Sequence, residues 1–93
     1  MKVADLAGGL LDYWVARAEG VDEKAARFVA GAHAYSSLWA HGGPIIERER
    51  ISIVEHPAHW VADTRGVRQV GGSPLEAAMR AYVSREFGDE VMG

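Results

Sequence analysis

The chain has 93 residues, 48% of them hydrophobic, which predicts one globular domain over residues 1–93 with a single modest core. The absence of cysteine excludes disulfides, thiolate metal ligands and thiol catalysis. A net charge of -3 argues against general binding to nucleic acid, whose affinity depends on neutralising phosphates.

The first predicted element is a helix over residues 4–18, where apolar side chains recur at helical spacing. Asp5 is placed to cap its start, and Gly20 follows its end. Gly8 and Gly9 weaken this prediction, because each costs about 1 kcal/mol relative to alanine inside a helix. Two glycines on one turn indicate that another backbone packs closely there.

The middle of the chain is harder to assign. Residues 22–32 fit a second helix or the entry to a strand, and both remain open. Residues 35–43 are expected to form a loop, and Pro44 then fits the first position of a short helical turn. A strand across residues 45–55 would put isoleucines and glutamates on one face. We therefore expect a helical turn or loop from Pro44 to Arg50.

A small sheet is expected next. Residues 51–54 and 60–62 have the composition of strands, and residues 64–66 that of a turn. Residues 67–70 are candidates for extending the sheet.

The last element is a helix with clear signals at both ends. Ser73 is placed as the cap, Pro74 at the first helical position and Glu76 at the third, and Gly88 stops the helix. Its apolar stripe comprises Leu75, Met79, Tyr82, Val83 and Phe87. The expected fold class is α+β, with two helices packed on an antiparallel sheet of two or three strands. The element order is helix, an undecided helix or strand, strand, strand, helix.

Most of the ten basic residues are arginine, which recognises planar anions through paired hydrogen bonds. We therefore expect a small anionic ligand rather than a long polyanion. No apolar run reaches the length of a targeting segment or a membrane span. The expected location is the cytoplasm, with no membrane partner.

The strongest candidate for a binding site begins at Trp39. Gly42 and Gly43 at a helix start, next to Pro44, would form an anion-binding concavity of backbone amides. Trp39 would stack on a base or another ring. The alternative is a tight turn with a core tryptophan.

The charged run that follows supports two interpretations. A solvated face with weak ion pairs is the simpler one. In the functional one, Arg48 or Arg50 holds a phosphate while a glutamate accepts from a hydroxyl or amine. Ile46, Glu47 and Arg48 are the candidate ligand-binding residues of this run. Ser73 also lies at a glycine-led helix start that favours an anion, although capping is its more ordinary role.

Other candidates carry weaker signals. Tyr13 and Trp14 point to different sides of the first helix, so one of them could reach a cleft or a partner subunit, although core packing is the commoner role. His56 and His59 resemble a metal-binding pair, but the intervening proline disfavours a regular helix. A hydrolase using His59 with Asp63 would lack a nucleophile motif. We expect no metal and no cofactor.

Several collinear blocks resemble the NinX-like family of small phage and prophage proteins, whose domain has no assigned function. The blocks include LDYWVA at residues 11–16, GGPIIERE at 42–49 and GSPL at 72–75. The other matching residues are 19–20, 35–36 with 39, 51–53, 60–62, 77–80, 82–83 and 88–91. The alanine-rich residues 22–34 depart from the pattern. The resemblance implies a phage or prophage accessory protein and supplies no reaction.

The expected function is that of a non-enzymatic binder of a small anionic, nucleotide-like ligand. In a phage, such a protein could act as a sponge that sequesters a host immune signal. A homo-oligomer is expected, because one small domain offers only a shallow pocket. The alternatives are a protein-interaction module that inhibits or adapts a host or phage enzyme, and a recombination or replication accessory.

Overall fold

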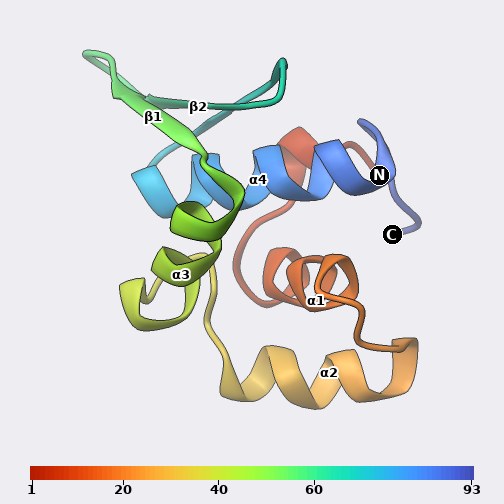
Figure 1. Ribbon diagram of the computed structural model, residues 1–93. Helices are drawn as coiled ribbons and strands as arrows, with labels where there is room; N and C mark the ends of the chain where they lie inside the picture. The colour runs from red at the N-terminus through yellow and green to blue at the C-terminus, as the bar shows by residue number, and fades with distance from the viewer.

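The helix α4, Pro74–Phe87, runs through the middle of the molecule (Figure 1). The computed structural model describes residues 1–93. In it the sheet packs on one side of α4, and α1, Gly8–Ala18, packs on the other. The α+β class is therefore confirmed. α4 contacts all three strands, whereas α1 packs against α4 rather than against the sheet.

The start of α4 forms as the sequence predicts. The Ser73 hydroxyl accepts from the Glu76 backbone N–H at 3.1 Å, and the Glu76 carboxylate accepts from the Gly72 N–H at 2.8 Å. Pro74 occupies the first helical position, where no N–H is needed. Gly88 ends the helix with φ of 88°, a backbone conformation that favours glycine.

Three strands form the antiparallel sheet in the order β1-β2-β3. They are β1, Ser52–Glu55, β2, Trp60–Thr64, and β3, Val67–Gly71. All three predicted strand segments are confirmed, with β1 displaced by one residue. Gly71 is buried where the sheet meets α4. A Cβ at this position would collide with the backbone of Ala77, so the close contact requires glycine.

The expected continuous helix over residues 4–18 is wrong. A 3-10 turn, Val3–Asp5, precedes a break, and α1 begins only at Gly8. Asp5 therefore does not cap α1, whose N-cap is Ala7 with no side-chain hydrogen bond. The expected close backbone contact is also wrong, because a Cβ at Gly8 or Gly9 would meet nothing within 4 Å.

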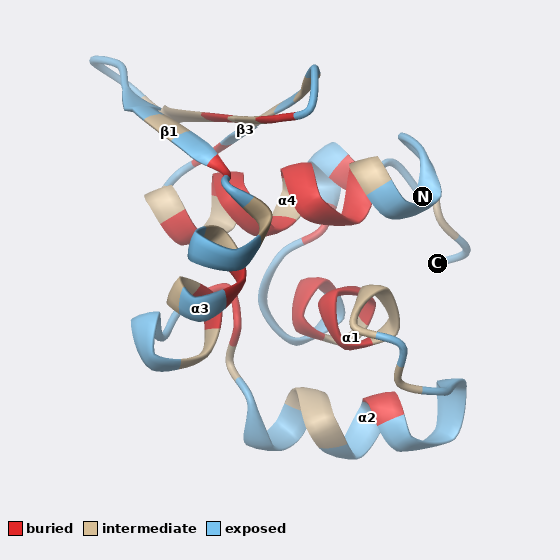
Figure 2. Cartoon of the chain, in the orientation of Figure 1, coloured by how far each residue is buried: buried red, intermediate tan, exposed pale blue.

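The undecided segment is helical. α2, Glu23–Ala32, begins at Asp22, whose side chain accepts from the Ala25 N–H at 2.9 Å. It packs against α1, and Ala26 is its only buried residue. Figure 2 shows this contrast, with α2 mostly exposed and the facing sides of α1 and α4 buried.

The predicted loop over residues 35–43 is the largest error. The helix α3, Trp39–Glu49, begins at Trp39 and contains Pro44 in its interior. Pro44 has no N–H to donate within the helix, and proline is common at the first position of a helix. The sequence therefore predicted that a helical turn begins at Pro44. The helix ends at Arg50, which adopts a left-handed conformation with φ of 54°.

Candidate functional site

The predicted ligand-binding residues lie in three places. Tyr13 and Trp14 lie on α1, and Ser73 caps α4. The others lie on α3: Trp39, Gly42, Gly43, Pro44, Ile46, Glu47 and Arg48. Gly42 packs against Leu75, so α3 and the start of α4 do meet. Tyr13 and Trp14 instead line a separate hollow beside α2.

The two glycines of α3 do not form a helix start. The N–H of Gly42 donates to the Leu38 carbonyl at 3.0 Å, so it is not free for an anion. Gly42 is buried, and a Cβ there would collide with the Tyr35 carbonyl and lie 2.6 Å from Leu75 Cδ2. The expected concavity of helix-start amides is therefore wrong, and Gly42 serves close packing. Any contact between these glycines and a ligand stays a prediction.

Trp39 lies at the exposed start of α3. Its side chain is 55% exposed, and its neighbour Leu38 is 51% exposed. A core role for this tryptophan is thereby excluded. Pro44 and Glu47 are also exposed, and Ile46 is half-buried. Leu38 and Trp39 therefore present two adjacent exposed apolar side chains at the start of α3.

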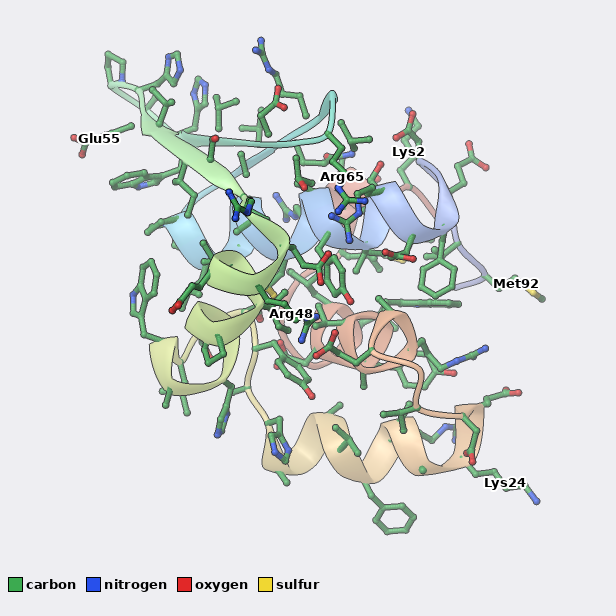
Figure 3. The ribbon with its side chains drawn as sticks, in the orientation of Figure 1. Lys2, Lys24, Arg48, Glu55, Arg65 and Met92 are labelled. Carbon is green, nitrogen blue, oxygen red and sulfur yellow. The ribbon has the colours of Figure 1, made fainter.

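Arg48 is half-exposed, and its guanidinium is occupied by two carboxylates of the protein. Its guanidinium donates to the Glu19 carboxylate through both terminal nitrogens, with Nη1 3.1 Å from Oε1, and its Nε lies 2.6 Å from a Glu49 oxygen. Figure 3 shows Arg48 between α3 and α1. The hydrogen bonds that Arg48 donates to Glu19 and then to Glu49 raise the pKa of this arginine. A phosphate would have to compete with both carboxylates, so this arginine holds helices together.

The ion pairs extend into a network over α4 and β2. Arg85 pairs with Glu49 and donates to the Thr64 hydroxyl at 3.1 Å. The Tyr82 hydroxyl donates to Glu19 at 2.6 Å. Burial, followed by the hydrogen bond to Glu19, raises the pKa of Tyr82, so it stays neutral. The network joins α1, α3, β2 and α4.

The interpretation of residues 47–50 as a solvated face therefore holds for only part of the run. Glu47 and Arg50 are exposed and form no ion pair within 4.0 Å. Glu49 is half-buried and joins two arginines, and Arg48 bonds two carboxylates.

The α1–α2 groove is a hollow between these two helices, with a volume of about 810 Å³. That volume lies within the range of small-molecule sites. Its walls come from both helices and from the last two residues of the chain. The lining residues are Gly9, Leu10, Tyr13, Trp14, Arg17, Glu23, Arg27, Ala30, Gly31, Met92 and Gly93.

Two arginines line this groove from opposite helices. Arg17 on α1 donates to the Tyr13 hydroxyl at 3.2 Å, and its guanidinium carbon lies 5.6 Å from the Trp14 ring centroid. Arg27 comes from α2, and neither arginine has an acidic partner within 4.0 Å. Trp14 is 9% exposed, and its buried indole N–H has no hydrogen-bond partner.

Neither arginine is among the ligand-binding residues predicted from the sequence. Arg17 follows Tyr13 by one helical turn, so the spacing of the first helix contained this signal. Arg27 joins them only because residues 23–32 are helical and pack on α1, which the sequence left undecided.

The histidines form two pairs. His56 and His59 stack with ring centroids 5.0 Å apart in the β1–β2 connection. His33 and His41 lie 4.8 Å apart, and His41 Nδ1 accepts from the Ala34 N–H at 3.0 Å. No group of three or more His, Cys, Asp or Glu side chains has the arrangement of a metal site.

These features define a small α+β protein with an internal charge network and a separate arginine-lined groove. A family model described as "Bacteriophage P22, NinX" matches residues 2–86. The chain therefore belongs to the NinX family of phage proteins. No match to a curated protein reaches significance. None of the helices combines the length and apolar character needed to cross a membrane.

Proposed function

We propose that the protein binds a small anionic ligand in the α1–α2 groove and releases it unchanged. The observation that supports this most is the pair Arg17 and Arg27, which line one hollow from two helices without acidic partners. In a protein of net charge -3, these two arginines outnumber Glu23, the one acidic side chain of the lining, so the side chains of the groove carry a net positive charge.

The rest of the groove suits a planar ring. Tyr13 and Trp14 lie edge to face with centroids 5.3 Å apart, and Leu10 adds an exposed apolar side chain beside them. An aromatic surface next to arginines favours a ligand that joins a ring to a phosphate or carboxylate. A nucleotide has this combination.

The groove offers few groups for chemistry on such a ligand. Its lining contains one carboxylate side chain, Glu23, and no histidine, serine, threonine or lysine. General acid–base or nucleophilic catalysis usually needs such groups in pairs. We therefore propose binding without conversion. In a phage protein, the corresponding role is that of a sponge that lowers the free concentration of a host signal.

The proposal is tested by measuring thermal stability and calorimetric binding with a panel of nucleotides, followed by mass spectrometry of the released ligand. A true ligand raises the melting temperature, saturates and is recovered intact. The double variant Arg17→Gln/Arg27→Gln should weaken binding at least tenfold. Arg65→Gln is the matched control, because Arg65 is an exposed arginine without an acidic partner in the β2–β3 turn.

Trp39→Ala distinguishes this groove from the site first predicted on α3. Loss of binding in Trp39→Ala, with retention in the double arginine variant, would place the ligand on α3. Consumption of the ligand would refute binding without conversion. No response to any nucleotide would count against the nucleotide class.

A protein-interaction role is the second candidate. The adjacent exposed side chains of Leu38 and Trp39 favour it, because aromatic residues are enriched at the centres of interfaces. Under this alternative, immobilised protein should retain one host or phage enzyme. Trp39→Ala should abolish retention, and nucleotides should have no effect.

A further inference from the structure

The two edges of the sheet differ in how their backbone groups are satisfied. At the β3 edge, the Val70 carbonyl accepts a hydrogen bond from Arg80 Nη1 at 2.8 Å. The same strand also carries the exposed, charged Arg68. Such features protect a sheet edge from pairing with another chain. The β1 edge carries a charged residue too, Glu55, but no side chain donates a hydrogen bond to the backbone of β1.

The ladder between β1 and β2 shows which groups are free. Hydrogen-bonded and non-hydrogen-bonded pairs alternate along antiparallel strands. The His56 N–H donates to the His59 carbonyl at 2.8 Å, so this is a hydrogen-bonded pair. By alternation, the pair of Val54 and Val61 is also hydrogen-bonded. Val54 therefore bonds to β2, and Ile53 and Glu55 direct their N–H and C=O groups away from the sheet. Neither residue's backbone finds another partner in the chain.

We propose that β1 pairs with β1 of a second copy, antiparallel and about a two-fold axis at Val54. In this register Ile53 of each copy lies opposite Glu55 of the other. Each such pair exchanges two backbone hydrogen bonds, so every free N–H and C=O of Ile53 and Glu55 is satisfied. The result is a continuous six-stranded sheet, which fits the isologous symmetry of most homodimers.

Neighbouring registers are less favourable. Pairing Glu55 with Glu55 would place two carboxylates directly opposite each other. Pairing Ile53 with Ile53 would bring Glu55 opposite Ile51, whose N–H already donates to the Ile46 carbonyl at 3.0 Å. Only the proposed register uses all the free groups and avoids opposed like charges.

The uncovered face of the sheet supports the same register. Val54, Val61 and Val70 lie directly opposite one another across the three strands. Val54 and Val70 are 55% and 45% exposed on this face. The two-fold axis brings Val54 next to its own copy as a non-hydrogen-bonded pair, where side chains approach most closely. The row of three valines then becomes a row of six.

Charge at the two ends of β1 also favours antiparallel pairing. Arg50 precedes the strand and Glu55 ends it, and neither forms an ion pair within 4.0 Å. An antiparallel partner brings the basic end of one strand toward the acidic end of the other. A parallel partner would bring like charges together.

This dimer is independent of the proposed ligand site. The sheet lies on one side of α4, and α1 and α2 lie on the other (Figure 1). The groove is lined by α1, α2 and residues 92–93, so each copy keeps its own open groove. Dimerisation and ligand binding are therefore measured separately, and either proposal can fail without the other.

Sedimentation equilibrium across the micromolar range tests the dimer. The unmodified chain should show a concentration-dependent dimer. Val54→Lys should weaken association at least tenfold, because two ammonium groups would meet at the axis. Val70→Lys is the matched control on the same face, and it should dimerise normally. A monomer at all concentrations, or equal effects of the two variants, would overturn the proposal.

Cross-linking and hydrogen exchange test the register itself. The chain has no cysteine, so Val54→Cys introduces a single thiol at the axis. Its oxidation to a disulfide dimer should be roughly tenfold or more faster than that of Val70→Cys, because pairing holds the two thiols together. The amides of Ile53 and Glu55 should gain protection as concentration rises, and that of Arg68 should not. Equal oxidation rates or unchanged protection would overturn the register.

Discussion

Arg48 of α3 donates through both terminal nitrogens to the carboxylate of Glu19, 29 positions earlier at the end of α1. The Tyr82 hydroxyl of α4 donates to the same carboxylate at 2.6 Å. Three helices that share little sequence proximity therefore meet at one acidic side chain. The sequence made Arg48 a candidate phosphate ligand, but in the structure it stabilises the packing of these helices through Glu19.

A double-mutant cycle should measure the coupling of this pair. With Arg48→Ala and Glu19→Ala, we expect a coupling free energy of about 1 kcal/mol, because the bidentate geometry is offset by the half-exposed arginine. Asp63 and Arg68 form the control pair, since they lie 3.6 Å apart with Arg68 71% exposed. Their coupling in urea unfolding should be close to zero, and equal values for both pairs would contradict the prediction.

Acid should weaken the network through Glu49. Hydrogen bonds from Arg48 and then Arg85 lower the pKa of Glu49 below its ordinary value of 4.5. A carboxylate with a lowered pKa in the folded state adds stability above its unfolded pKa, and this stability is lost as the pH falls through the lowered value. The free energy of unfolding should therefore decrease as the pH is lowered below about 4.5.

The variant Glu49→Gln isolates this contribution. It should reduce stability at neutral pH and make the acid-induced loss smaller than in the unmodified chain. The measurement is urea unfolding at a series of pH values. An unchanged pH profile in Glu49→Gln would show that Glu49 is not the responsible group.

The adjacent glycines of α3 should respond to alanine in opposite directions. A Cβ at position 42 would collide with the Tyr35 carbonyl, a backbone group that cannot move cheaply, so Gly42→Ala should cost about 1–3 kcal/mol. At Gly43 the nearest atom is Trp39 Cε3 at 3.6 Å, an ordinary contact. Gly43→Ala should therefore gain up to about 1 kcal/mol from helix propensity. Thermal unfolding of the two variants compares the effects, and equal effects would refute this account.

Asp12 should be important for the segment that leads into α3. Its buried carboxylate accepts from the Ser36 N–H at 2.8 Å. Asp12→Ala leaves that N–H without a partner and should cost about 1–3 kcal/mol. Asp12→Asn keeps an acceptor and should recover most of the loss. Hydrogen exchange at Ser36 should accelerate in Asp12→Ala only, and similar exchange in both variants would argue against this contact.

The elements that the sequence predicted well depend on signals between near neighbours. Ser73, Pro74 and Glu76 form a complete helix start within four positions, and their bonds appear as expected. The strands around the Arg65–Gly66 turn and the α+β class follow from equally local patterns. The family resemblance also rests on the sequence alone and is confirmed by the match over residues 2–86.

Only the tertiary structure decided α3 and the candidate site. Gly42, Gly43 and Pro44 oppose a helix locally, yet the helix forms because Gly42 fits closely against Tyr35 and Leu75. Arg17 and Arg27 share a groove only after α2 packs on α1. Local preferences are set by neighbours in the chain, whereas close packing and shared charge arise between residues that only the fold brings together.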